Sequence, residues 1–324
     1  MAFFVIAIHT HPFEFFNLPV FVMRLYDLIC SCAVPFFFLT TGYLLARKLR
    51  KNSDFNIKSN IVKKSLKKTF RLYIIWSIVY IPLALYEYSH IYKELLGSRI
   101  LYDVVLYIHG LIFKGEHFNS WILWYLLSSI YALMMIYFLV KKGKSIKYIT
   151  IIGVFVFIIG IVMTDLINTT SSLGYYESFL QKLIQYTFGN GRLTIGFLYI
   201  PLGMLLYDIV LSKKKASICI FIGIILTFLG LKDWFMISNF ITVLTSVGIF
   251  ILLLNIHLKE SDIYVKLRTI SMIIYFMHMW VYSLYCMFIY KRMSFGMDCF
   301  VGTSLITFII AIVYVKYKYR KINN

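Results

Sequence analysis

Two histidines in apolar sequence are the side chains best suited to acid–base chemistry. His9 ends a short apolar run in AIHTHPF, and His278 lies inside a long apolar run in IYFMHMW. Because imidazole changes its charge near neutral pH, either ring could take a proton from a hydroxyl group that attacks a carbonyl carbon. An ionisable side chain is costly inside a membrane span, so each is a candidate functional residue. We predict His9 as the first catalytic residue and His278 as the second.

Each histidine also has a structural interpretation, which the sequence leaves open. His9 could lie at a helix end among headgroup water, and His278 could be a hydrogen-bonded residue between packed helices. Tyr275 precedes His278 by three positions, so both would lie on one helical face, and Tyr275 is predicted to share the catalytic cavity. His11 competes with His9 as the base, but it is expected in the Pro-containing loop that follows.

Three cationic side chains are candidates for anion binding. Lys68 and Arg71 lie one helical turn apart in KKTFRLYIIW and would face the same side, where they could hold phosphate groups. The general excess of positive charge in cytoplasmic loops is the alternative explanation, and Arg71 is the stronger candidate. Arg192 enters an apolar helix after a long loop, where it could bind a carboxylate or phosphate or extend to lipid headgroups.

The segment HFNSWILWYLL and the residue before it supply the last candidates. Glu116 is predicted to face an acceptor, and Trp124 to line the substrate site, although Trp121 and Trp124 also fit the aromatic belt of a membrane interface. Motifs for nucleotide phosphates, for zinc proteases and for a nucleophile elbow are absent, and no metal is expected. The five cysteines form no CxxC pair and are interpreted as small packing residues.

Membrane-spanning helices must position these side chains. The chain has 60% hydrophobic and 15% charged residues, and its mean hydropathy is +0.80. Soluble domains carry about 25% charged residues. Apolar runs of roughly 20 residues recur, which is the length that an ~30 Å hydrocarbon core requires. The sequence therefore predicts an all-α, polytopic membrane bundle in a single domain, residues 1–324, and not a β-barrel, which would show shorter alternating segments.

We predict about ten transmembrane helices. The expected spans are 25–46, 71–88, 121–140, 146–164, 193–211, 216–231, 236–256, 269–290 and 299–316, after a first helix at 1–9. Nine residues make a helix only about 13 Å long. This first helix is therefore expected to be truncated, with its true start upstream of Met1, or else to be buried in the bundle. The segment 100–113 is expected to be an interfacial or re-entrant helix because Asp103 and His109 interrupt it.

The basic residues orient the predicted helices. Most of the 33 Lys and Arg residues, which give the chain a net charge of +19, lie in 47–71, 141–147, 212–215, 257–268 and the tail from 316. The positive-inside rule places these segments and both termini in the cytoplasm. A nucleic-acid partner is not expected, because the charge is spread over loops and does not form one soluble basic face. The expected partner is the anionic bilayer surface.

The order of these motifs resembles the membrane acyltransferase-3 family. His9, followed by a Pro-containing turn and PFFFLTTGYLL, is similar to the presumed catalytic histidine of the first helix in that family. The arginine found ten residues before that histidine would fall before the chain begins. Lys68 and Arg71 resemble the R-x-x-R pair of the family, with Lys in place of one Arg. HFNSWILWYLL, GNGRLTIGFLYIPLGMLL and IYFMHMW resemble three further family segments.

The resemblance implies an O-acyltransferase, in the simplest case an O-acetyltransferase, of the bacterial inner membrane. It implies acetyl-CoA or another acyl-CoA as a cytoplasmic co-substrate held by Arg71 and Lys68, and an envelope glycan or a related small acceptor on the outer side. The branch that it resembles includes peptidoglycan and polysaccharide O-acetyltransferases and the membrane domain of serine racemases. Two alternatives therefore stay open: a transporter of a small polar solute such as serine, and a truncated, inactive chain. The acceptor and the oligomeric state do not follow from the sequence.

Overall fold

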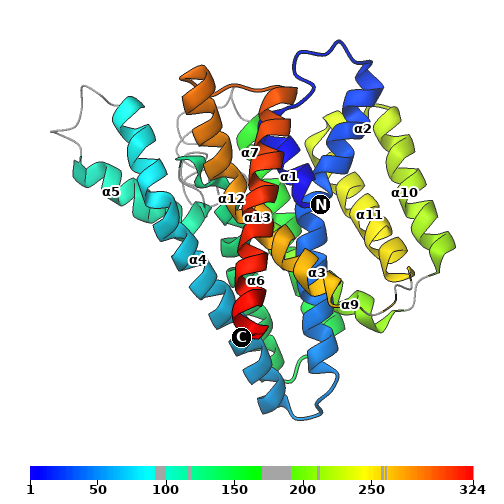
Figure 1. Ribbon diagram of the computed structural model, residues 1–324. Helices are drawn as coiled ribbons and strands as arrows, with labels where there is room; N and C mark the ends of the chain where they lie inside the picture. Colours follow the sequence, from blue (N-terminus) through cyan, green and yellow to red (C-terminus); the bar gives the residue numbers. More distant parts are fainter. Residues whose placement is uncertain are drawn as a thin grey trace. The chain divides into compact units, whose positions relative to one another are not determined.

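The computed structural model describes residues 1–91, 100–115, 118–169, 191–209, 212–256, 259 and 261–323 (Figure 1). Within these ranges the secondary structure is helical and contains no strand, which confirms the all-α prediction. Long apolar helices are the expected result for this composition, because a helix pairs its backbone polar groups within one segment and can therefore cross lipid.

Seven helical segments among the described residues are long and apolar enough to span a membrane: Val20–Leu49, Phe55–Tyr86, Ser120–Lys141, Ile146–Asp165, Phe235–Leu254, Ile263–Tyr290 and Met297–Arg320. They confirm a polytopic helical membrane bundle, whereas the predicted number of about ten spans is not confirmed. The other three predicted spans correspond to the short helices α1 (Ala2–Thr10), α9 (Arg192–Asp208) and α10 (Lys213–Phe228). The longest of these, with 17 residues, extends about 26 Å, less than an ~30 Å hydrocarbon core.

The chain forms two compact units. The first contains Met1–Val34, Ser212–Asp233 and Ile241–Asn324, and the second contains Pro35–Leu211 and Trp234–Phe240. The predicted long helix 25–46 crosses the boundary as two helices, α2 (Val20–Ser31) and α3 (Ala33–Leu49). The break at Cys32 has a local cause, because the ring of Pro35 cannot donate a hydrogen bond to the carbonyl group of Ser31.

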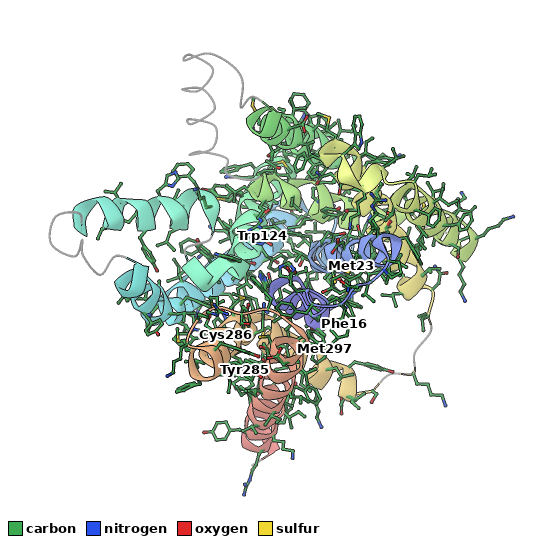
Figure 2. The ribbon with its side chains drawn as sticks, turned by 90° about the horizontal axis from the view of Figure 1, so that it is seen from above. Phe16, Met23, Trp124, Tyr285, Cys286 and Met297 are labelled. Atoms are coloured by element: carbon green, nitrogen blue, oxygen red, sulfur yellow. The ribbon has the colours of Figure 1, made fainter. Side chains whose placement is uncertain are left out.

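In the first unit, α1 packs against α2, α12 (Ile263–Tyr290) and α13 (Met297–Asn323). The buried side chains of Ala2, Ile6, Ile274 and Ala311 form the core between these helices. Helices α12 and α13 run side by side, and Figure 2 shows Tyr285, Cys286 and Met297 near the turn that joins them.

Both thiols near this turn hydrogen-bond to one carbonyl group. The Sγ atoms of Cys286 and Cys299 lie 3.6 and 3.5 Å from the carbonyl oxygen of Ser294, which also accepts a hydrogen bond from the Tyr282 hydroxyl. All five cysteines are free, and four of them are buried.

The second unit contains most of α3 together with α4 (Phe55–Ile91), α5 (Ile100–His109), α6 (Trp124–Lys141), α7 (Ile146–Thr169) and α9. Helices α3 and α9 cross with their backbones almost in contact. A Cβ atom added to Gly42 would lie 1.9 Å from the carbonyl oxygen of Ile200, and one added to Gly203 would lie 2.2 Å from that of Leu39. Small residues at such crossings are typical of membrane helices, where close packing replaces the hydrophobic effect.

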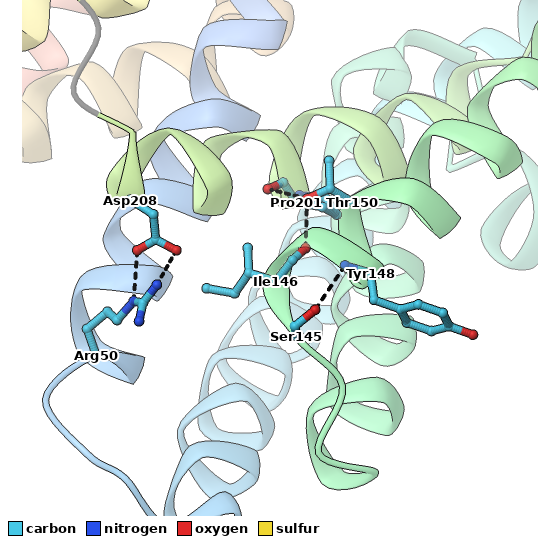
Figure 3. A network of polar contacts seen from close by, with 7 residues as sticks. All are labelled: Arg50, Ser145, Ile146, Tyr148, Thr150, Pro201 and Asp208. Carbon is cyan, nitrogen blue, oxygen red and sulfur yellow. Dashed lines mark hydrogen bonds and ion pairs between the residues drawn. The ribbon is translucent and has the colours of Figure 1, made fainter.

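Polar contacts fix the same two helices at their ends (Figure 3). Arg50, just after α3, forms a two-pronged ion pair with Asp208 at the end of α9, and its Nε atom donates to Asp208 Oδ1 over 2.8 Å. This hydrogen bond raises the pKa of the Arg50 guanidinium group above its ordinary value. The Thr150 hydroxyl of α7 donates to the carbonyl oxygen of Pro201 in α9 over 3.2 Å, which links a third helix to the pair.

The segment after α5 is held by tyrosine hydroxyl groups. A π-helical turn, Gly110–Lys114, continues α5, and Tyr73 of α4 donates to the carbonyl oxygen of Leu111 over 2.7 Å. Tyr131 of α6 donates to that of Ile112 over 2.8 Å. The predicted interfacial or re-entrant segment 100–113 is thus helical and is bonded to two neighbouring helices.

Candidate functional site

The packing of α1 against α12 brings the two predicted catalytic histidines together. The ring centroids of His9 and His278 are 5.4 Å apart, with their planes tilted by 33°. His9 lies one residue before the end of α1 and is half-buried, whereas His278 has an exposed fraction of 0%. One half-exposed imidazole ring therefore lies beside one that is fully enclosed.

Helix α12 determines which nitrogen of His278 carries the proton. The Nδ1 atom lies 2.7 Å from the carbonyl oxygen of Tyr275 and 3.2 Å from that of Ile274. A carbonyl oxygen only accepts hydrogen bonds, so Nδ1 must be the donor, and the lone pair of the neutral ring is on Nε2. The Nε2 atom is buried and has no hydrogen-bond partner among the described residues. The chain thus holds a proton-accepting nitrogen in a fixed orientation, on a ring that neighbours the ring of His9.

Tyr275 shares this environment. Its side chain is buried, and its ring centroid is 6.2 Å from that of His278. The contact that orients His278 comes from the backbone carbonyl group of Tyr275. The rings of Tyr275 and His278 are therefore neighbours, in agreement with the prediction that the two residues share one helical face.

Several contacts fix the end of α1 that carries His9. The hydroxyl group of Tyr26 in α2 donates to the carbonyl oxygen of Ala7 over 3.0 Å, and the backbone N–H of Gly296 donates to that of Thr10 over 2.8 Å. His11 follows in a left-handed conformation, is exposed, and lies edge-to-face with Phe295 at 5.0 Å. His11 is therefore outside the helix, as predicted for this competing candidate.

Helix α13 carries two buried hydroxyl groups that the prediction missed. The Thr303 and Ser304 side-chain oxygens are buried and have no hydrogen-bond partner within the described residues. Because buried polar atoms are nearly always paired, such atoms suggest a bound water molecule or a ligand. Their signal in the sequence is two adjacent polar residues in the apolar run FVGTSLITF.

In the second unit, the structure pairs two residues that were predicted separately. The guanidinium carbon of Arg192, at the start of α9, lies 5.8 Å from the ring centroid of Trp124, at the start of α6. This is within the range of a cation–π interaction. The Trp124 ring also contacts Phe38 of α3, with 6.0 Å between ring centroids. Two of the three predicted substrate-binding residues, Trp124 and Arg192, thus meet at one aromatic cluster.

The remaining candidates do not join these clusters. Lys68 and Arg71 are exposed on α4, one turn apart, and neither forms an ion pair with another residue in the described part of the chain. Helix α4 begins at Phe55, so the basic stretch before the predicted span is itself helical. Glu116 lies outside the described residues. Within the described residues, no group of three or more His, Cys, Asp and Glu side chains could hold a metal ion.

Comparison with known proteins gives one match over nearly the whole chain and two partial matches. Residues 1–316 match the family model described as "Acyltransferase domain". The chain is 28% identical over 190 residues to an amino-acid racemase of Enterococcus faecalis, an alignment that covers 57% of this chain and 24% of the relative. A second amino-acid racemase of that organism is 31% identical over 139 residues, which cover 43% of this chain and 18% of the relative.

The matched region is thus less than a quarter of the length of either racemase. No solved structure matches the chain. The bundle of apolar helices and the family match over residues 1–316 together show that this multi-pass membrane protein belongs to the acyltransferase-3 family.

Proposed function

We propose that the protein is an O-acyltransferase that moves an acyl group, in the simplest case acetyl, from acyl-CoA to a hydroxyl group of an envelope glycan or a related small acceptor. The observation that carries this proposal is the histidine pair, in which the ring of His9 lies 5.4 Å from a His278 ring whose Nε2 lone pair is fixed and buried. Family membership supports the same class of reaction.

In the proposed reaction His9 acts as the general base. Its ring accepts the proton of the acceptor hydroxyl group while the hydroxyl oxygen attacks the thioester carbonyl carbon. The new C–O bond forms, the C–S bond breaks, and the proton on His9 passes to the departing thiolate. His278 Nε2 is suited to accept a hydrogen bond from His9 and so to orient that ring and favour its protonated form, as the third member of a catalytic triad does.

Binding of the two substrates is assigned to the other candidates. Arg71, with Lys68, is proposed to contact the phosphates of acyl-CoA, because Arg binds phosphate through two parallel hydrogen bonds and Lys acts as a point charge. Trp124, Arg192 and Glu116 are proposed to contact the acceptor. The distribution of basic residues supports an inner-membrane protein whose two termini lie in the cytoplasm.

The test is transfer of labelled acetyl from acetyl-CoA in inside-out membrane vesicles that contain the envelope acceptor. We expect His9→Ala to lower transfer about 10²-fold or more, because a general base contributes ~10²–10⁴-fold to a rate. His11→Ala is the matched control, since His11 is exposed and lies two residues away, and it should retain activity. Equal transfer by His9→Ala and wild type would disprove the role of His9.

Transport of a small polar solute such as serine is the second candidate. It is favoured by the two relatives named as amino-acid racemases, which handle molecules of that class. Saturable serine uptake that does not respond to acetyl-CoA, together with no labelled glycan, would favour the transporter over the acyltransferase.

A further inference from the structure

Helix α10 has one face closely packed against α11 (Phe235–Leu254). A Cβ atom added to Gly223 of α10 would lie 2.1 Å from Thr245 Oγ1, and one added to Gly248 of α11 would lie 2.9 Å from the carbonyl oxygen of Ala216. Small residues therefore allow this face of α10 to pack closely against α11. The opposite face carries large apolar side chains that are exposed, among them Phe221 at 64% and Phe228 at 67%.

An open groove lies along this exposed face. Its volume is about 660 Å³, and it is lined by Lys214, Ser217, Ile218, Ile220, Phe221, Ile224 and Leu252. Lys214 and Ser217 come from the first two turns of α10, and the rest of the lining is apolar. The groove is therefore amphipathic along its length, with one charged end.

The charge at that end is not neutralised by neighbours in the described structure. Lys213, Lys214 and Lys215 form the first turn of α10, where the Ser212 hydroxyl oxygen accepts a hydrogen bond from the backbone N–H of Lys215. All three lysines are exposed, and none forms an ion pair with a described residue. Asp233 is the one acidic residue in the sequence from 212 to 256. The positive end of the helix dipole adds to this unpaired charge.

We infer that this groove binds a membrane phospholipid with an anionic headgroup. An acyl chain would lie against Ile218, Phe221 and Ile224, and the phosphate would meet Lys214. The occupant must combine an apolar chain with a negative head, which matches the two ends of the groove. Basic pockets at the ends of apolar helices in membrane proteins bind such headgroups. The inference does not depend on the acyltransfer reaction.

The test uses a tryptophan placed in the groove. Phe221→Trp in lipid nanodiscs provides a fluorophore that is quenched on contact by lipids with brominated chains, after subtraction of the wild-type signal. We expect brominated phosphatidylglycerol to quench it at a lower mole fraction than brominated phosphatidylcholine. Adding Lys214→Gln should reduce this preference about fivefold, which corresponds to ~1 kcal/mol for one lysine at an anionic surface.

Lys142→Gln in the same background is the matched control, because Lys142 is an exposed lysine between α6 and α7 that does not line the groove. It should leave the preference unchanged. An equal effect of the two lysine substitutions would show that the lipid preference comes from general surface charge, and it would overturn the proposal. Equal quenching by both lipids would overturn it as well. Quenching by neither lipid, with crosslinking of Phe221→Cys to a second copy or another protein, would assign the groove to a protein partner.

Discussion

At the scale of single residues, the most informative feature is the orientation of the His278 ring. Its Nδ1 proton is bound by carbonyl groups of its own helix, so the ring does not need a side chain from elsewhere to select its tautomer. A histidine whose only role was to fill space would more often have both nitrogens paired, because an unpaired buried acceptor costs about 1–3 kcal/mol. The unpaired Nε2 atom, on a ring that neighbours the ring of His9, is what favours a functional role over a structural one.

His278→Asn separates these two roles. The Asn side-chain N–H can still donate to the carbonyl oxygen of Tyr275, but no acceptor atom remains at the position of the imidazole Nε2. We expect kcat to fall ~10- to 100-fold, the range found when a partner that orients a histidine is removed, with the KM for acetyl-CoA unchanged. An unchanged kcat would leave His278 a structural residue.

The residue types could be chosen from the sequence, but their contacts could not. His9 and His278 stood out because imidazole is rare and costly in apolar sequence. That their rings are neighbours depends on the packing of α1 against α12, which the spacing of residues does not encode. The same holds for Arg192 and Trp124, which were predicted one by one and meet across α9 and α6. Thr303 and Ser304 were missed because hydroxyl groups in helices commonly bond to their own backbone.

At the scale of elements, the crossing of α3 and α9 explains why glycine is found at positions 42 and 203. Here the helix backbones approach so closely that no side chain fits between them. A membrane crossing of this kind is stabilised by van der Waals contact along the whole interface. A single methyl group would therefore separate the two helices over more than one turn.

Gly42→Ala should destabilise the protein by about 1–3 kcal/mol, the usual cost of overpacking, because its Cβ atom would meet the Ile200 carbonyl oxygen at 1.9 Å. The measurement is the thermal unfolding midpoint in detergent. Thr40→Ala is a suitable control, since the Thr40 hydroxyl bonds to the Phe36 carbonyl oxygen of its own helix, and it should change stability by a few tenths of a kcal/mol. Equal midpoints for Gly42→Ala and wild type would show that the helices can separate without cost.

The elements themselves were largely predictable, and their ends were not. Each apolar run became a helix because a lipid-facing segment has few other ways to pair its backbone. The division at Cys32 was missed because the apolar pattern continues through it, although the proline four residues after Ser31 interrupts the helix. The start of α4 at Phe55 was missed because the basic residues before position 71 interrupt the apolar pattern without interrupting the helix.

At the scale of the whole molecule, the alternation of basic segments predicts which side of the membrane each loop faces. A cysteine introduced at Ser53 should react with an impermeant maleimide only in inside-out vesicles, because it lies among the basic residues that the positive-inside rule retains in the cytoplasm. A cysteine at Asn17 should react only from outside. Both positions are exposed, and four of the five native cysteines are buried, so background labelling should be low. Labelling of both positions from one side would reject the predicted topology.

The composition was sufficient to predict the class of the whole molecule, an all-α membrane bundle. The number of spans was harder to predict, because α1, α9 and α10 are apolar but short, and hydropathy alone treats such helices as spans. Whether a 16-residue helix crosses a bilayer depends on tilt, local thinning and neighbouring helices, none of which a sequence window contains.

The placement of α1 also has a consequence for biosynthesis. This nine-residue helix packs against α12 and α13, which leave the ribosome long after it does. A nascent chain that carries α1 but not yet α12 and α13 lacks both the helices that bury α1 and the second imidazole of the pair. The pair of His9 and His278 can therefore assemble only after α12 has been synthesised, however well the earlier helices insert.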